Sequence, residues 1–191
     1  METHNEATLA RFPGDEDDGV LAERVLCGDD AAFTRLVERY HGKLFRLVRG
    51  IVGDWHRSED VCQEVFTIVF RKLGGFRGRS RLSTWVYRIA VNAALKARRK
   101  RYLPEVSSLS AVPPSADPRF RRIESDEVLQ KLLAPLPENL RVAVVLRDQM
   151  GLNYEEMASV LGCSRGAVEQ RLHRAMVALR EIWKEADWTE R

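Results

Sequence analysis

The sequence lacks the features that mark secreted, membrane and metal-binding proteins. No apolar run approaches the roughly 20 residues that a transmembrane helix needs. The N-terminal stretch has neither the basic start nor the apolar centre of a signal peptide. The three cysteines, Cys27, Cys62 and Cys163, are odd in number, far apart and in no CxxC pair, and the four histidines show no ligand spacing. We therefore expect a cytoplasmic protein with no disulfide, metal or cofactor, in which the three cysteines are small buried residues.

Strand-like alternation of convincing length is also missing, and so are the common catalytic motifs. The sequence contains no glycine loop that could cradle phosphate, no paired-carboxylate motif and no nucleophile elbow. Apolar residues instead recur at three- and four-residue spacing, which is typical of helices. We expect an all-α protein that is not an enzyme.

Acidic residues are absent from one long stretch of the chain. Residues 67–101 carry eleven Lys or Arg and no Asp or Glu, whereas residues 1–20 carry six acids against Arg11. A basic surface of this kind most often binds a phosphate backbone. The alternative is a solvated face that only aids solubility.

Proline and serine content divides the chain. Residues 1–19 are predicted to form a disordered acidic arm, and residues 103–123, which contain Pro104, Pro113, Pro114 and Pro118, a flexible linker. The remaining ranges, 20–102 and 124–186, are predicted to form two small helical domains.

In the first domain, three helices are expected. One follows a cap at Asp29 or Asp30 and ends at Gly53. A second is expected to be capped by Ser58, and a third covers about 83–101. In the second domain, we expect four helices: about 124–134, one starting at Pro137, about 154–161 after a cap at Asn153, and about 165–184.

Residues 154–176 have the pattern of a helix-turn-helix. Gly162 permits the tight turn, while Val168 and Leu172 anchor the second helix on the first. Arginine and glutamine can contact base edges, and a serine at a helix N-terminus suits a phosphate. The face of the second helix expected to meet a major groove carries Ser164, Arg165, Glu169, Gln170, His173 and Arg174.

The chain resembles the extracytoplasmic-function (ECF) group of sigma-70-type sigma factors from about residue 20 to 185. Residues 58–66 resemble the family's polymerase-docking helix, and residues 76–78 and 83–92 its promoter-opening segment. Residues 136–141 and the helix-turn-helix resemble its −35 reader. Two motif sets in the right order and spacing make this resemblance specific.

The resemblance implies residue roles, and it implies core RNA polymerase, promoter DNA and an anti-sigma factor as partners. We expect no direct insertion of this chain into a membrane. The residues expected to contact the clamp helices of the largest polymerase subunit are Asp60, Gln63, Glu64 and Phe66. The expected −10 and melting contacts are Phe76, Tyr87, Ile89 and Asn92, with Arg77, Arg79, Arg81, Arg88, Lys96, Arg98, Arg99, Lys100 and Arg101 on phosphates. Arg171 joins the exposed helix-turn-helix residues named above as a −35 contact.

Several assignments keep an alternative. For Tyr87 we favour base contact over core packing, and for Trp85 core packing; the exposed edge at Asp60 could be merely solvated. Many relatives carry a basic residue at the position of Glu169. The Glu169 carboxylate could instead accept a hydrogen bond from a cytosine amine. His173 could read a base or cover the groove.

Two other functions fit parts of the pattern. A helix-turn-helix repressor or activator would work without polymerase but would leave the basic segment unexplained. A sigma-mimic decoy would bind an anti-sigma factor without needing that segment.

Overall fold

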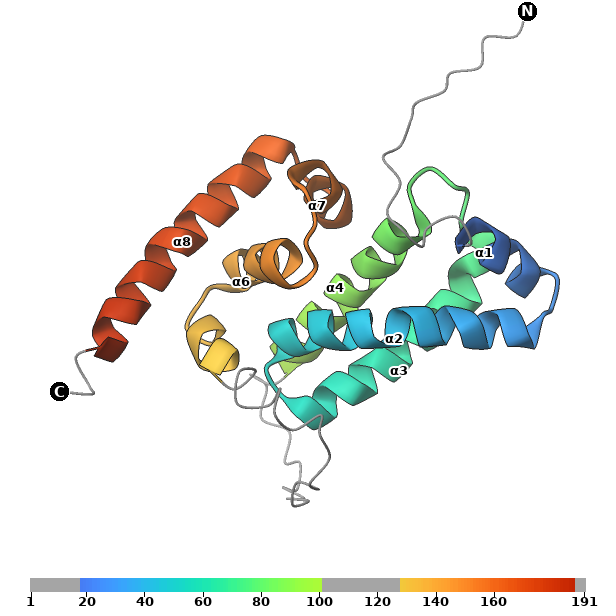
Figure 1. Ribbon diagram of the computed structural model, residues 1–191, viewed down its shortest axis with the longest axis horizontal. Coiled ribbons are helices and arrows are strands. Elements are labelled where there is room, and N and C mark those ends of the chain that lie inside the picture. The colour runs from blue at the N-terminus through green and yellow to red at the C-terminus, as the bar shows by residue number, and fades with distance from the viewer. Residues whose placement is uncertain (1–17, 101–127, 188–191) are drawn as a thin grey trace, which may run out of the picture.

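The computed structural model describes residues 18–100 and 128–187, and every regular element in these ranges is helical (Figure 1). The all-α prediction is confirmed. None of the helices in the described ranges has both the length and the apolarity to cross a bilayer. The predicted linker, and the acidic arm up to residue 17, lie outside the described residues.

The N-terminal domain is built around one long helix. Its elements are α1 (Asp18–Leu26), α2 (Asp30–Val52), α3 (Trp55–Lys72), the short η2 (Leu73–Gly75) and α4 (Leu82–Lys100). Helix α2 packs against α1, α3 and α4. Its inward stripe of Leu36, Leu44, Leu47 and Ile51 is fully buried, which is the three- and four-residue pattern that predicted the helix.

Asp18 departs from the predicted acidic arm. It starts α1 and is buried, where its carboxylate accepts from Arg39 Nη1 at 2.6 Å and from the Tyr40 hydroxyl. An acid buried with two donors is a structural anchor rather than part of a solvated acidic run.

The ends of α2 and α3 follow capping chemistry. Asp29 caps α2 through its side chain, and Gly53 ends it with a φ of 82°. The predicted cap of the next helix at Ser58 is wrong. Asp54 caps α3 four residues earlier by accepting from the backbone of Arg57, and Ser58 is buried inside the first turn, where its hydroxyl donates to the carbonyl of Asp54.

The C-terminal domain begins with a helical segment at residues 128–133. It continues with α6 (Glu138–Val144), the π-helical η4 (Val145–Gln149), α7 (Tyr154–Leu161) and α8 (Arg165–Asp187). Pro137 is the N-cap of α6, so the helix begins one residue after its predicted start at Pro137. The helix-turn-helix matches the prediction: Asn153 and Glu156 form a capping box, and Gly162 makes the turn with a φ of 63°.

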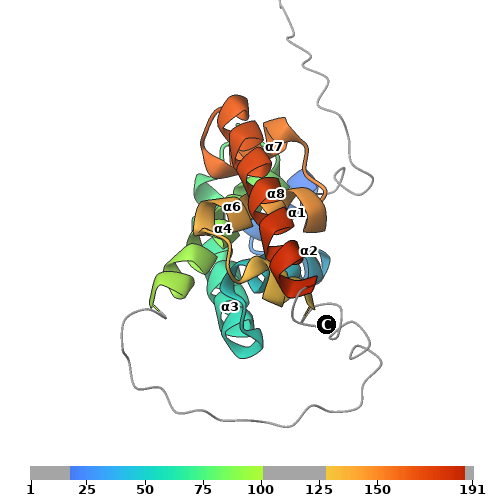
Figure 2. The same cartoon turned by 90° about the vertical axis from the view of Figure 1, so that its left-hand side faces the viewer.

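The two domains pack on each other. Helix α2 contacts α6 and η4, and α4 contacts α7. Figure 1 shows α6 and α7 between α8 and the N-terminal helices, and Figure 2 looks onto the α8 side with those helices behind it. A Cβ built on Gly50 would lie 2.8 Å from Val145 Cγ2, so only glycine allows this approach of α2 to η4.

Next to that contact, one backbone carbonyl accepts hydrogen bonds from both domains. The oxygen of Ile51 accepts from Arg98 Nη1 at 2.9 Å and from Arg141 Nη1 at 3.3 Å, one arginine from each domain. Arg141 is 2% exposed and also donates to the carbonyl of Ala134. A buried guanidinium is tolerated where carbonyls accept from it.

Candidate nucleic-acid interface

Helix α8 presents the predicted recognition face. Val168 and Leu172 are buried against the domain, as expected, and Ser164 Oγ caps the helix by accepting from the backbone N–H of Ala167 at 3.2 Å. Its hydroxyl oxygen is therefore used inside the protein. The other residues of the predicted face are exposed, namely Arg165, Glu169, Gln170, His173 and Arg174, while Arg171 is half-buried.

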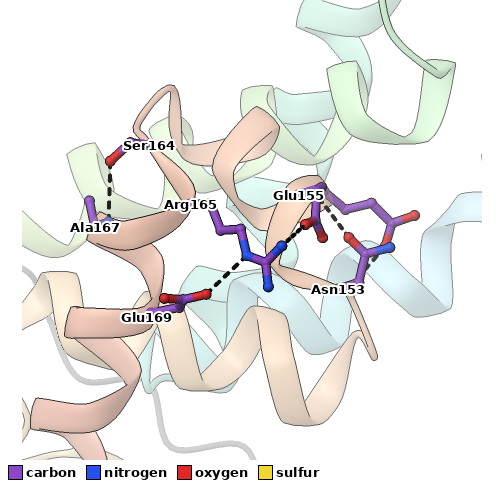
Figure 3. A network of polar contacts seen from close by, with 7 residues as sticks. Asn153, Glu155, Ser164, Arg165, Ala167 and Glu169 are labelled. Atoms are coloured by element: carbon purple, nitrogen blue, oxygen red, sulfur yellow. Dashed lines mark hydrogen bonds and ion pairs between the residues drawn. The ribbon is translucent and has the colours of Figure 1, made fainter.

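A polar network surrounds the first residue of α8 (Figure 3). Arg165 Nη1 lies 2.7 Å from Glu155 Oε1 of α7, and Arg165 Nε lies 2.9 Å from Glu169 Oε1 of α8. The guanidinium carbon is also 5.9 Å from the centre of the Tyr154 ring. The hydrogen bond to Glu169, and the negative charge of Glu155, raise the pKa of Arg165 further above its ordinary value.

Helix α4 presents a second polar face. Four of its predicted contact residues are exposed and spaced so that they lie along one side: Arg88, Asn92, Lys96 and Arg99. Lys100 is exposed too, and Arg101 lies outside the described residues. These side chains make this surface of α4 basic. The side-chain amide of Asn92 adds a hydrogen-bond donor group and an acceptor.

The loop before α4 carries the remaining predicted contacts. Arg77 and Arg79 are exposed on either side of Gly78, which has a φ of 65°. The Phe76 ring lies 5.4 Å from that of Trp85, and both residues are half-buried. Ile89 is half-buried as well.

The C-terminal domain contacts three of the basic residues on α4 or just before it. Arg81 Nη1 lies 3.3 Å from Glu156 Oε1, and Arg88 Nη2 donates to the carbonyl of Ser159. Arg99 Nε lies 3.3 Å from Glu138 Oε2. A cleft of about 350 Å³ remains between the domains, with Asn92, Leu95 and Arg99 on one side and Glu138, Val160 and Arg171 on the other.

Three predicted contact residues are buried in this structure, where each makes contacts inside the protein. Tyr87 is 6% exposed and lies edge-on to Tyr40, with ring centres 6.3 Å apart. Arg98 is buried and donates a hydrogen bond to the carbonyl of Ile51, so it links α4 to α2. Phe66 is buried and stacked on His41. Periodicity placed these residues on the right helices but did not identify which face each helix buries.

The predicted polymerase edge is exposed on α3. Asp60, Gln63 and Glu64 all face solvent, and Glu64 Oε1 lies 3.9 Å from Lys96 Nζ. Phe66 is buried, whereas Phe70, one turn further along this helix, is 53% exposed. An acidic edge beside an apolar ring suits a basic helical partner.

Sequence reasoning missed several residues that shape these surfaces. Arg141 was noticed only as part of a motif, although a lone arginine among Leu, Val and Ala in an expected core helix signals a buried tether. Glu155 was not singled out, although it stands ten residues before Arg165 across a helix-turn-helix. The cysteines were also only partly predicted, since Cys62 is buried but Cys27 is exposed and Cys163 half-buried.

Comparison with known families matches both domains. The family described as sigma-70 region 2 matches residues 36–102, and sigma-70 region 4 matches residues 126–179. The RNA polymerase sigma-H factor of Pseudomonas aeruginosa is 39% identical over 86% of this chain and 92% of its own length. The chain belongs to the ECF sigma-70-type sigma factors. A second relative of this sigma factor is the ECF RNA polymerase sigma-E factor of Escherichia coli K12, 38% identical over 85% of this chain and 92% of the relative.

Solved structures share the fold of this sigma factor. The structure of CnrH in complex with the cytosolic domain of CnrY has a TM-score of 0.72 at 25% identity, covering 89% of this chain and 99% of the other. The sigma factor RpoE in complex with the anti-sigma factor NepR from Bartonella quintana has a TM-score of 0.60 at 23% identity, covering 80% and 96%. This chain is therefore a transcription initiation factor of the ECF type, in a family that regulates rather than catalyses.

Proposed function

We propose that this sigma factor binds core RNA polymerase through α3, holds the −10 element on α4 and the preceding loop, and reads the −35 element with α8. One observation carries the proposal: an exposed helix-turn-helix face and an acid-free basic segment occur in the same chain. A repressor needs only the first of these. An initiation factor needs both, because the two weak contacts become strong when one chain makes them together.

The proposed division of labour follows the sequence boundaries. Residues 20–102 would contact polymerase and the −10 element, and residues 124–186 the −35 element. Because α1 begins at Asp18, only the residues before it would belong to the arm, and residues 103–123 would be the linker. The two matched families, at residues 36–102 and 126–179, fall within these proposed domains.

Promoter opening would use the α4 side of the molecule. Unstacking a base costs a few kcal/mol, and stacking it on an aromatic side chain returns about 1–3 kcal/mol. Phe76 and Ile89 are half-buried and are the candidates to receive a flipped base, and Asn92 is exposed about one turn after Ile89. Arg77 and Arg79 are exposed in the loop where strand phosphates would pass.

An anti-sigma factor is the proposed regulator. One similar solved structure holds CnrH in complex with the cytosolic domain of CnrY, and another holds the sigma factor RpoE in complex with the anti-sigma factor NepR. We further propose that the chain has no catalytic activity of its own and that polymerase supplies the chemistry.

Run-off transcription with purified core polymerase tests the proposal. Core with this protein should give selective transcripts from a pool of upstream DNA of its own genome, and core alone should not. Glu64→Arg reverses charge on the exposed α3 edge and should weaken core binding at least about tenfold. The matched control is Glu23→Arg, at an exposed site on α1, and it should bind core like the wild type.

The outcomes separate the alternatives. Failure to bind core overturns the sigma assignment. Core binding without any transcript favours a decoy, and tight sequence-specific binding by the free protein favours a repressor or activator.

A further inference from the structure

The first residue of the recognition helix has a charge that opposes the local field. Arg165 begins α8, where the helix dipole presents partial positive charge and favours acids over cations. A cation here is locally unfavourable. Residues that break a local rule in this way often mark functional positions.

Two carboxylates offset this unfavourable charge and fix the guanidinium in place. Glu155 holds Nη1 at 2.7 Å from α7, and Glu169 holds Nε at 2.9 Å from one turn along α8. The group therefore bridges both helices of the motif, close to the Tyr154 ring. Nη2 makes no hydrogen bond to the described part of the protein, and the Arg165 side chain is 61% exposed.

The N-terminal turn of a recognition helix is the part that meets base edges in the major groove. Guanine, with O6 and N7 as acceptors, is the base most often contacted by arginine. A guanidinium already held in one orientation loses less conformational freedom when it makes that contact.

We propose that Arg165 reads a guanine of the −35 element and that Glu155 and Glu169 are positioning residues that hold its guanidinium. This inference rests on the proposed function. It replaces the sequence-based interpretation in which Glu169 accepts directly from a cytosine amine. The Oε1 of Glu169 already accepts from Arg165, and a Glu169 that turned to a base would release one of the two contacts that orient the arginine.

The network contributes little to stability. All three side chains are about half exposed or more, at 61%, 62% and 47% for Arg165, Glu155 and Glu169, and ion pairs of this kind are screened by water and salt. Neutralising either glutamate should therefore change base preference without changing the melting temperature. A merely structural network would behave in the opposite way.

The test is selection of −35 sequences from a duplex pool randomised over that element. The full chain selects from the pool both with core polymerase and alone at low salt, so base preference is measured even if transcription fails. The variants are Arg165→Lys, Glu169→Gln, Glu155→Gln and the double variant Arg165→Lys/Glu169→Gln. Glu181→Gln is the matched control, because Glu181 also pairs with a cation on α8, Lys184, but near its far end.

Arg165→Lys keeps the charge but loses the planar fork, and should reduce guanine preference at one position about tenfold. Glu169→Gln and Glu155→Gln should reduce preference at that same position, each by less, and Glu169→Gln should add nothing once Arg165 is lysine. Glu181→Gln should select like the wild type.

Three results would overturn the inference. Loss of preference at a different position in Glu169→Gln would make Glu169 a direct reader. Equal weakening on all sequences in Arg165→Lys would make Arg165 a phosphate contact. A chain that selects no sequence in either condition would overturn the inference. A chain that selects sequences alone but gives no transcripts with core would overturn only the proposed function.

Discussion

At the scale of single residues, buried charge is the least predictable part of this protein. Asp18 belongs by sequence to an acidic run, yet it accepts from Arg39 and Tyr40 inside the N-terminal domain. Asp18→Asn removes the charge that both donors face and should lower the free energy of unfolding by about 1–3 kcal/mol in urea denaturation. Asp148→Asn, at an exposed site on η4, is the control. Equal small losses in both variants would show that Asp18 is not an anchor.

A second residue-scale prediction concerns Cys62. Burial, with a smaller contribution from the nearby charge of Glu59, raises the pKa of this thiol from 9.0 to about 12. The thiolate is the reactive form, so Cys62 should stay unmodified by a disulfide reagent between pH 7 and 9 while exposed Cys27 reacts. Mass spectrometry of the modified wild type and of Cys27→Ser identifies which thiol reacted. Fast labelling of Cys62 in the native protein would contradict the prediction.

The same shift gives a stability change with a definite sign. The unfolded thiol loses its proton near pH 9.0, whereas the folded one holds it to about 12, so the folded state binds more protons above pH 9. The contribution of Cys62 is fully present below pH 9 and falls as the pH rises towards 12. Wild type should therefore lose stability relative to Cys62→Ala over that range in urea denaturation.

At the scale of elements, local chemistry predicted the helix ends wherever only one cap was available. Asn153 with Glu156, and Gly162 after α7, were found because no competing cap stands nearby. The start of α3 was misplaced because both Asp54 and Ser58 can cap, and the sequence favoured the one followed by acids. Which of the two residues becomes the cap depends on how α3 packs against α2, and that packing is a tertiary property.

Asp54 should therefore be the residue whose loss weakens α3. Asp54→Ala removes the acceptor for the Arg57 backbone N–H and should cost about 1 kcal/mol in urea denaturation, whereas Asp54→Ser should retain most of it. If Asp54→Ala and Asp54→Ser are equally destabilised, the side-chain cap is not the stabilising feature.

At the scale of the whole molecule, the sequence predicted the two domains but not their contact. Spacing and charge predicted that α4 and α8 are the DNA-facing helices. They could not indicate that Arg81, Arg88 and Arg99, all expected on phosphates, would each meet an oxygen of the C-terminal domain. That contact depends on distant residues fitting together, above all Gly50 against Val145. The face proposed to bind DNA is thus partly occupied by the protein itself in this arrangement.

If a DNA strand binds along α4, we expect the contacts of Arg88 and Arg99 with the C-terminal domain to open, and Gly50 is the position at which to test this. In Gly50→Ala, the new methyl would meet Val145 at 2.8 Å and Gln149 Oε1 at 3.0 Å, so η4 must move away from α2. Gly42→Ala is the matched control: it lies on the same helix, and a Cβ there meets nothing within 4 Å. Both changes raise helix propensity by about 1 kcal/mol, so a loss of helix in circular dichroism would not be expected from either.

Small-angle scattering should show a larger radius of gyration for Gly50→Ala alone. That variant should also bind single-stranded DNA more tightly at low salt, because the arginines of α4 are released from the C-terminal domain. Identical scattering and DNA binding in the two variants would mean that the domain contact does not limit access to α4.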